Sequence, residues 1–253
     1  MNVGMYSAAA GMRVGQDYQQ MISENLSLQS VPGYRQTLPV FSTDPTLASD
    51  GLQSGTSGNP SGIQMKGVTD FSQGPIAPST GPYHMAIEGK AFFEVREADG
   101  STSYTRDGAF SISPRGELRT ADGAAVLGSG DSAITVDPAT ASTASVGSDG
   151  TISIGGATVG KVGFAHFANP SASLQPGAEG RFTATKPSDV EQGLAAGDQV
   201  MPSSLEQSNG NPVQQMADMI QAVRLYEANQ KSVMAVDDNT NQLITTLGAH
   251  PQG

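Results

Sequence analysis

The side chains that most often carry acid–base or metal chemistry are few and far apart in this sequence. Cysteine is absent, which removes thiol catalysis, thiolate metal sites and disulfides together. The imidazoles are those of His84, His166 and His250. A zinc site needs three or four donors close together, and this spacing gives no sign of one. The histidines are therefore interpreted as surface side chains or as side chains satisfied within the fold.

Carboxylates in the centre of the chain are the remaining catalytic candidates. Glu88, Asp107 and Asp122 could pair as general acid and base if a cleft brought them together. Acidic side chains at strand ends and turns are more often simply solvated. The Gly89-Lys90 pair is not part of a phosphate-binding loop, because Ala91 stands where Ser or Thr would bind magnesium. We predict no catalytic, cofactor or metal site and no enzymatic activity.

Composition and charge narrow the class of protein further. The 253 residues include 13 basic and 24 acidic side chains, a net charge of −11, which repels nucleic acid. Glycine (31) and proline (15) are frequent, so much of the chain is predicted to be turns. No apolar run reaches the length of about 18 residues that a membrane-spanning helix needs. Met1–Tyr6 lacks the basic and apolar regions of a cleaved signal peptide, so we expect none.

A long helix is predicted near the C-terminus. Asn211 suits the N-cap, Pro212 the first helical position, and Gln214 the position that can bond back to the cap. Neither glycine nor proline occurs from 213 to 247, and Gly248 is a typical stop. A helix of this length would extend for roughly 50 Å.

Apolar residues recur along this helix at the spacing of a coiled-coil stripe. The predicted stripe comprises Val213, Met216, Ile220, Val223, Met234, Ile244 and Leu247. Polar residues such as Glu227 and Asn241 interrupt it. A helix with such a stripe needs partners to bury its apolar face.

A second helix is predicted from about Val3 to Gln29. Met5, Met12 and Leu26 share one heptad position, and Ile22 lies beside them. Glycines at 4, 11 and 15 each cost up to about 1 kcal/mol relative to alanine, so packing must stabilise this helix. The small residues in 8–11 and at 15 would let another helix approach closely. Val31-Pro32-Gly33-Tyr34 ends the helix in a turn.

Strand and turn signals dominate the region between the helices. Residues 91–95 and 103–105 flank Asp99-Gly100, and residues 151–154 and 157–159 flank Gly155-Gly156, as in hairpins. The predicted fold is α+β, with long terminal helices forming a coiled-coil-like pair around an antiparallel all-β central domain. The predicted parts are an N-terminal assembly helix (1–34), an extended Gly/Pro-rich linker region (35–82), the β domain (83–204) and a C-terminal assembly helix (205–253).

Short motifs along nearly the whole chain resemble those of bacterial flagellar rod and hook proteins. In chain order they are Ser23–Leu26, Pro32-Gly33-Tyr34, Gln73-Gly74-Pro75, Ala86–Gly89 with Phe92-Phe93, Tyr104–Phe110, Thr120–Gly123, Leu205–Asn209, Asn211-Pro212-Val213 and Tyr226–Gln230. Ser27, Leu28 and Val31 depart from the usual N-terminal signature, and Gly210 from the C-terminal one. The chain length is similar to that of the proximal and distal rod types (FlgF/FlgG type).

The resemblance implies a structural subunit of the flagellar basal-body rod that polymerises through its terminal helices and transmits torque. It favours the proximal type slightly over the distal type. The implied partners are copies of itself, other rod subunits and the flagellar export apparatus, in a periplasmic location reached without a cleaved signal. The candidate assembly interface is Met5, Met12, Ile22, Asn25, Leu26, Pro32, Gly33, Tyr34, Asn211, Pro212, Val213, Met216, Ile220, Val223, Tyr226, Met234, Ile244 and Leu247.

Two other classes of function remain open from the sequence. An extracellular β-rich fibre or adhesin-like protein would account for the centre of the chain but gives no reason for long helices at both ends. A hydrolase would need Glu88, Asp107 and Asp122 to be held in one pocket.

Overall fold

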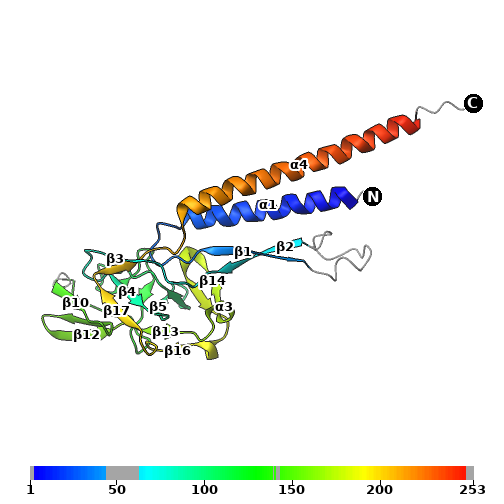
Figure 1. Ribbon diagram of the computed structural model, residues 1–253. Coiled ribbons are helices and arrows are strands. Elements are labelled where there is room, and N and C mark those ends of the chain that lie inside the picture. Colours follow the sequence, from blue (N-terminus) through cyan, green and yellow to red (C-terminus); the bar gives the residue numbers. More distant parts are fainter. Residues whose placement is uncertain (1–2, 44–62, 139, 141–142, 249–253) are drawn as a thin grey trace, which may run out of the picture. The chain divides into compact units, whose positions relative to one another are not determined.

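The computed structural model describes residues 3–43, 63–138, 140 and 143–248 (Figure 1). Contacts within the chain divide it into two compact units. The helical unit comprises Met1–Leu26, Thr37–Val68 and Asn211–Gly253, and the β unit comprises Ser27–Gln36 and Thr69–Gly210. The units are interleaved in sequence, so the chain passes between them four times.

The helical unit is built from the two predicted helices and a pair of strands. Helix α1 spans Val3–Ser27 and helix α4 spans Pro212–Gly248. They lie side by side and antiparallel (Figure 1). Strands β1 (Thr37–Thr43) and β2 (Ile63–Thr69) form a separate two-stranded sheet within the predicted linker region. The predicted pair of terminal helices is confirmed.

Local signals define the start of α4 much as predicted. The Asn211 side chain accepts hydrogen bonds from the backbone N–H groups of Val213 (3.0 Å) and Gln214 (3.3 Å), which is an N-cap. The Gln214 side chain does not bond back to the cap; it donates to Asp218 one turn ahead (3.0 Å). The N-cap is therefore formed as predicted. The expected bond from the Gln214 side chain back to the cap is replaced by the bond to Asp218.

Small residues bring the two helices together. A Cβ atom added at Gly11 would lie 2.8 Å from the side chain of Asn229, and one at Gly15 would lie 3.6 Å from the Cβ of Tyr226. Further along, Ile22 and Met21 pack with the fully buried Ala222. The predicted close approach is confirmed at Gly11 and Gly15, where it compensates for the low helix propensity of glycine.

The β unit contains short antiparallel strands in several sheets. The elements are β3 (Ile76–Pro78), β4 (Met85–Glu88), β5 (Phe92–Arg96), β6 (Thr102–Thr105), β7 (Ser111–Ile112), β8 (Leu118–Arg119), β9 (Ala125–Val126), β10 (Ala144–Val146), β11 (Thr151–Ile154), β12 (Ala157–Lys161), β13 (Phe164–His166), α3 (Pro170–Ser173), β14 (Leu174–Pro176), η2 (Ala178–Gly180), β15 (Phe182–Ala184), η3 (Pro187–Asp189), β16 (Glu191–Gln192), β17 (Gln199–Pro202) and β18 (Ser204–Glu206). The largest sheet has the order β14-β15-β6-β5-β9-β8-β7, with β13 also pairing with β5 and β16 with β13. Smaller sheets are β10-β11-β12, β17-β4 and β18-β3.

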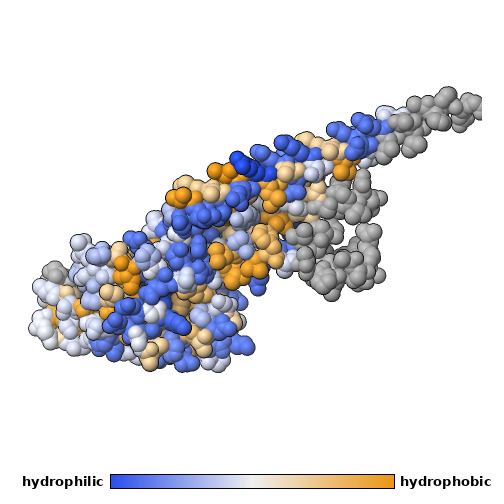
Figure 2. All heavy atoms as spheres, viewed as in Figure 1, coloured by the Kyte–Doolittle hydropathy of each residue, from blue (hydrophilic) through white to orange (hydrophobic). Residues whose placement is uncertain are grey.

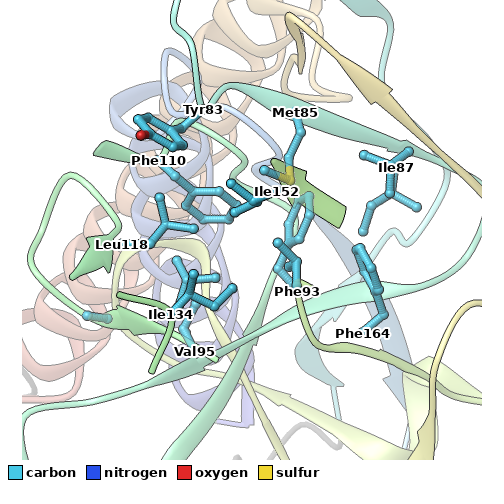
Figure 3. Close-up of a cluster of buried hydrophobic side chains, with 14 of the residues drawn as sticks. Tyr83, Met85, Ile87, Phe93, Val95, Phe110, Leu118, Ile134, Ile152 and Phe164 are labelled. Atoms are coloured by element: carbon cyan, nitrogen blue, oxygen red, sulfur yellow. The ribbon is translucent and has the colours of Figure 1, made fainter. Parts of the chain in front are cut away.

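The predicted hairpins are present. Strands β5 and β6 pair around Gly100, which has a φ of +88°, and β11 and β12 pair around Gly155-Gly156. Two apolar clusters fill the unit. In the larger one, side chains including Phe93, Phe110, Leu118 and Phe164 converge from several strands (Figure 3). The α+β prediction is confirmed.

Candidate assembly interface

Exposed large apolar side chains are concentrated in the helical unit. On α4 they are Val213, Met216, Ile220, Val223, Leu225 and Met234, and on β1 and β2 they are Leu38, Val40, Phe41 and Val68. The β unit contributes only Val159 and Met201 among the described residues. Apolar patches along α4 are visible in Figure 2. Exposed apolar surface of this extent is typical of an interaction site.

The apolar stripe predicted on α4, which we call the α4 stripe, is a different face of the helix from the one that packs on α1. The packed face contains Met219, Ala222 and Tyr226. The stripe residues Ile220 and Val223 come one position after Met219 and Ala222, respectively. One position rotates a side chain by about 100° around an α-helix. Ile220 is accordingly 56 % exposed and Ala222 is fully buried. The stripe is thus left without a partner within this chain wherever its side chains are described.

Several predicted interface residues have contacts within the chain. Ile22 is 2 % exposed, and Tyr226 is half-buried opposite Gly15. Met12 and Leu26 are also half-buried, so only part of each remains available. The side chains of Met5, Ile244 and Leu247 lie outside the described residues.

Asn25 connects the end of α1 to the first strand of the helical unit. Its side-chain amide donates to the carbonyl of Thr37 and accepts from the Thr37 N–H, both at 2.8 Å. The side chain is buried. Asn25 therefore fixes how the chain turns back at the end of α1.

A buried ion triad lies in the β unit where the N- and C-terminal signature motifs meet. Glu206 pairs with Arg35 (Nη1–Oε1, 2.7 Å) and with Arg106 (Nη1–Oε2, 3.2 Å), and all three side chains are essentially enclosed. Glu206 also accepts the Gly74 N–H at 2.9 Å. The two guanidinium groups donate further bonds to backbone carbonyls, Arg35 to Ser72 at 2.7 Å and Arg106 to Gly89 at 2.6 Å.

Electrostatics make Glu206 the essential member of the triad. Burial lowers the pKa of Arg106 to about 10, and the Glu206 carboxylate opposes that shift. Both arginines are cationic at neutral pH, so one carboxylate compensates two enclosed charges. Removing one partner from a buried ion pair is costly because the other charge is left uncompensated.

Asn209 ties together the segments through which the chain leaves and enters the β unit. Its side-chain oxygen accepts the Gln36 N–H at 2.8 Å, and its amide donates to the carbonyls of Asp70 (2.8 Å) and Ser72 (3.0 Å). Its backbone N–H donates to the Tyr34 carbonyl. Three of the four crossings between units are at Gln36, just before Thr69 and after Gly210. We call the ion triad and Asn209 together the clasp.

Gly33 is essential to the clasp for two separate reasons. Its φ is +68°, and a Cβ there would lie 2.3 Å from the backbone carbonyl carbon of Arg106. Its N–H also donates to the Glu206 carbonyl at 2.7 Å. The predicted turn at Gly33 is confirmed, and the close approach explains why the Pro32-Gly33-Tyr34 motif requires glycine.

Replacing Gly33 with alanine is expected to destabilise the protein by more than about 2 kcal/mol, because backbone cannot move aside as a flexible side chain can. Urea unfolding measures the loss. Gly123→Ala is the matched control, since Gly123 also has a positive φ (+95°) but no atom within 4 Å of an added Cβ. That variant should show only the backbone cost of about 1–2 kcal/mol. Equal losses in the two variants would contradict the proposed role of close packing.

The catalytic candidates have structural partners. Glu88 is exposed and accepts a bond from Gln199, Asp122 is paired with Arg181, and Asp107 accepts the Ala109 N–H. Burial raises the pKa of Asp107. The histidines are likewise engaged, His84 with Ser79 and His166 with Glu191. His250 lies outside the described residues.

Within the described ranges, no group of three or more His, Cys, Asp or Glu side chains is arranged to hold a metal ion. Among the helices that the structure describes, none combines the length and the apolar character needed to cross a membrane.

Paired terminal helices that carry an exposed apolar stripe are typical of a structural subunit that assembles with other subunits. Comparison with protein families identifies the kind of subunit. Residues 86–154 match the flagellar hook protein FlgE/F/G D1 domain, and residues 201–246 match the C-terminal domain of flagellar basal body rod FlgEFG proteins.

Similar proteins cover nearly the whole chain. The flagellar basal-body rod protein FlgF of Salmonella typhimurium is 30 % identical, with 97 % of this chain and 99 % of that protein aligned. FlgF of Caulobacter vibrioides is 37 % identical over 69 % of this chain and 67 % of its own length. FlgG of Buchnera aphidicola (subspecies Baizongia pistaciae) is 28 % identical over 94 % of this chain and 97 % of its own length.

The chain belongs to the FlgF/FlgG family of flagellar basal-body rod proteins. The resemblance found in the sequence is confirmed, and this is a family of structural proteins, not enzymes. Relatives named FlgF and relatives named FlgG are both among the similar proteins, so the comparisons give the family and not the rod position.

Proposed function

We propose that this chain polymerises, with copies of itself and with other rod subunits, into the proximal part of the flagellar rod, and that the polymer transmits torque. The observation that carries the proposal is the α4 stripe, which stays exposed although α4 is already paired with α1. A contact between unlike surfaces of identical subunits propagates as a helix when it does not close into a ring.

The proximal assignment rests on similarity alone. FlgF of Caulobacter vibrioides, at 37 % identity, supports the FlgF type slightly over the FlgG type. Labelling this chain in isolated flagellar basal bodies and imaging them by cryo-microscopy tests the assignment. We expect label at the proximal end of the rod, and label confined to the distal part would overturn the proximal assignment.

We further propose that the chain reaches a periplasmic location through the flagellar export apparatus. Membership of the rod family supports this route, and the absence of cysteine is compatible with passage in an unfolded state. The clasp then holds together, within the β unit, the chain segments that lead to the helical unit.

Substituting Ile220 with aspartate tests the role of the α4 stripe. We expect the variant to fold as the wild type does, with an unfolding free energy within about 0.5 kcal/mol, because Ile220 is exposed in the single chain. We expect it not to polymerise, because burying an unpaired carboxylate in an apolar interface is costly. Sedimentation velocity and electron microscopy measure assembly.

Gln221→Asp is the matched control for this variant. Gln221 is the next residue on α4, is also exposed, and lies off the stripe. The Gln221→Asp substitution introduces the same charge as Ile220→Asp and should leave assembly nearly unchanged. Normal assembly of Ile220→Asp, or equal loss of assembly in both variants, would exclude the α4 stripe as the contact surface.

A further inference from the structure

A hollow of about 500 Å³ in the β unit has no role in the assembly account. Its lining residues come from four separate stretches of chain and are Glu94, Ser129, Lys161, Val162, Phe164, Gln192, Gly193 and Leu194. Its size lies within the range of small-ligand sites, which combine apolar walls with a few polar groups.

Glu94 is the unusual member of this lining. It lies in the middle of β5, in the largest sheet, and only 6 % of its surface is exposed. Its backbone is fully used, with the N–H donating to Gly163 and the carbonyl accepting from Leu127. Within the described part of the chain, its carboxylate has neither a hydrogen-bond donor nor an ion-pair partner. Buried carboxylates are normally paired, so this one is available to a cationic partner.

The surrounding backbone leaves room for the Glu94 carboxylate. A Cβ added at Gly163 would lie 2.8 Å from Glu94 Oε2, so the glycine provides the space that this oxygen occupies. The carboxylate oxygens of Glu94 are not fully enclosed. The carboxylate therefore keeps contact with the hollow.

Charges nearby do not neutralise Glu94. Lys161 lines the same hollow, but its ammonium group pairs with Asp149 at 3.5 Å. Asp131, which pairs with Arg96 at 2.8 Å, adds negative potential. Burial and the Asp131 charge both raise the pKa of Glu94.

We propose that this hollow is a binding site for an organic cation, in which Glu94 pairs with an ammonium or guanidinium group. Such a group could be carried by a free small amine or by a basic side chain of another copy of this chain. The chemistry is the same in both cases: a buried carboxylate gains the partner that its own chain does not supply.

The uncompensated charge of the Glu94 carboxylate lowers the stability of the folded protein. Because the pKa of Glu94 is higher in the folded state than in the unfolded chain, the folded state binds more protons between those two values. Stability therefore falls as the pH rises through that interval and stays lower above it. Glu94→Gln should have a higher urea midpoint than wild type at pH 7, and the difference should disappear below about pH 4. This result also establishes that the variant folds.

Titration of the folded protein with n-butylammonium and methylguanidinium tests the proposal, with the backbone amide resonances of Gln192, Gly193 and Leu194 in the lining of the hollow as the readout. We expect a saturable shift in wild type and at least about tenfold weaker binding to Glu94→Gln, corresponding to the loss of one ion pair. Glu88→Gln, which neutralises an exposed carboxylate, is the matched control and should bind as wild type does. Lys161→Met should bind these cations more tightly, because it removes a like charge.

Two results would overturn the proposal. One is equal binding to wild type and to Glu94→Gln. The other is binding of acetate that is lost in Lys161→Met, which would make the hollow an anion site. The two sources of the cation are separated by assembly: if a neighbouring copy supplies it, Glu94→Gln polymerises less well and n-butylammonium inhibits wild-type polymerisation. If a free amine supplies it, assembly is unchanged while the titration result holds. The titration is run below the concentrations at which the chain polymerises, so it does not depend on the proposed rod position.

Discussion

A chain that ends after Asn211, and so lacks α4, is expected to fold its β unit and to lose polymerisation completely. The β unit keeps both of its apolar clusters and the clasp, none of which uses a residue of α4. The helical unit loses Ala222 and Met219, the partners of Ile22 on α1, together with the whole α4 stripe. Circular dichroism and sedimentation velocity measure the two effects, and restored swimming measures function.

A chain that ends after Gly248 is the matched control for this truncation. It keeps all of α4 and loses only the last five residues, so normal assembly is expected. Polymerisation or restored motility by the chain that lacks α4 would show that the assembly surface lies elsewhere. Loss of the folded β unit in that chain would show that the two units are not independent.

Replacing Glu206 with glutamine should lower the unfolding free energy by about 3–5 kcal/mol. This is the largest effect that we expect from neutralising a single charged side chain in this protein. The variant leaves the guanidinium groups of Arg35 and Arg106 buried without their shared carboxylate. Urea unfolding at pH 7 measures the loss. A triple variant with Arg35→Met, Arg106→Met and Glu206→Leu should recover much of it, because the uncompensated charge is gone.

Glu117→Gln is the control for the Glu206 variant, since Glu117 forms an equally short pair with Arg119 at 2.6 Å. That pair is partly exposed, so its loss should cost no more than about 1 kcal/mol. A cost below about 1 kcal/mol for Glu206→Gln would show that the buried triad is not what stabilises the clasp.

The start of α4, the end of α1 to within two residues, and the hairpins could be predicted from the sequence because their causes are local. The Asn211 side chain caps the start of α4, and the helix continues without interruption to Gly248, the last described residue at this end. Glycines at 100 and 155 produce turns through their positive φ angles. Such signals act over a few residues and do not depend on the rest of the fold.

Which face of α4 packs on α1 could not be predicted, for a physical reason. The apolar pattern marks the α4 stripe, but the face that packs within the chain includes Ala222 and Asn229 opposite Ile22 and Gly11. Small and polar residues allow helices to approach closely but leave a weak apolar signal. Periodicity reveals that a face needs a partner and does not reveal whether that partner lies in the same chain.

The clasp was missed because its members are distant in sequence. Arg106 and Glu206 are 100 positions apart, and Gln36 and Asn209 are 173 positions apart. The motif around Glu206 resembles a family signature, and that resemblance gives no physical role for its single charge. The available signal was that charge, an acidic residue between Leu205 and Gln207 in a neutral motif.

We propose that the α4 stripe is buried only in contacts between subunits. Sedimentation velocity of the full-length chain over a wide concentration series, with Ile220→Asp run in parallel, tests it most directly. We predict that wild type shifts to large species as the concentration rises, while the variant remains a folded monomer. A wild-type chain that stays compact and monodisperse at every concentration would contradict the claim.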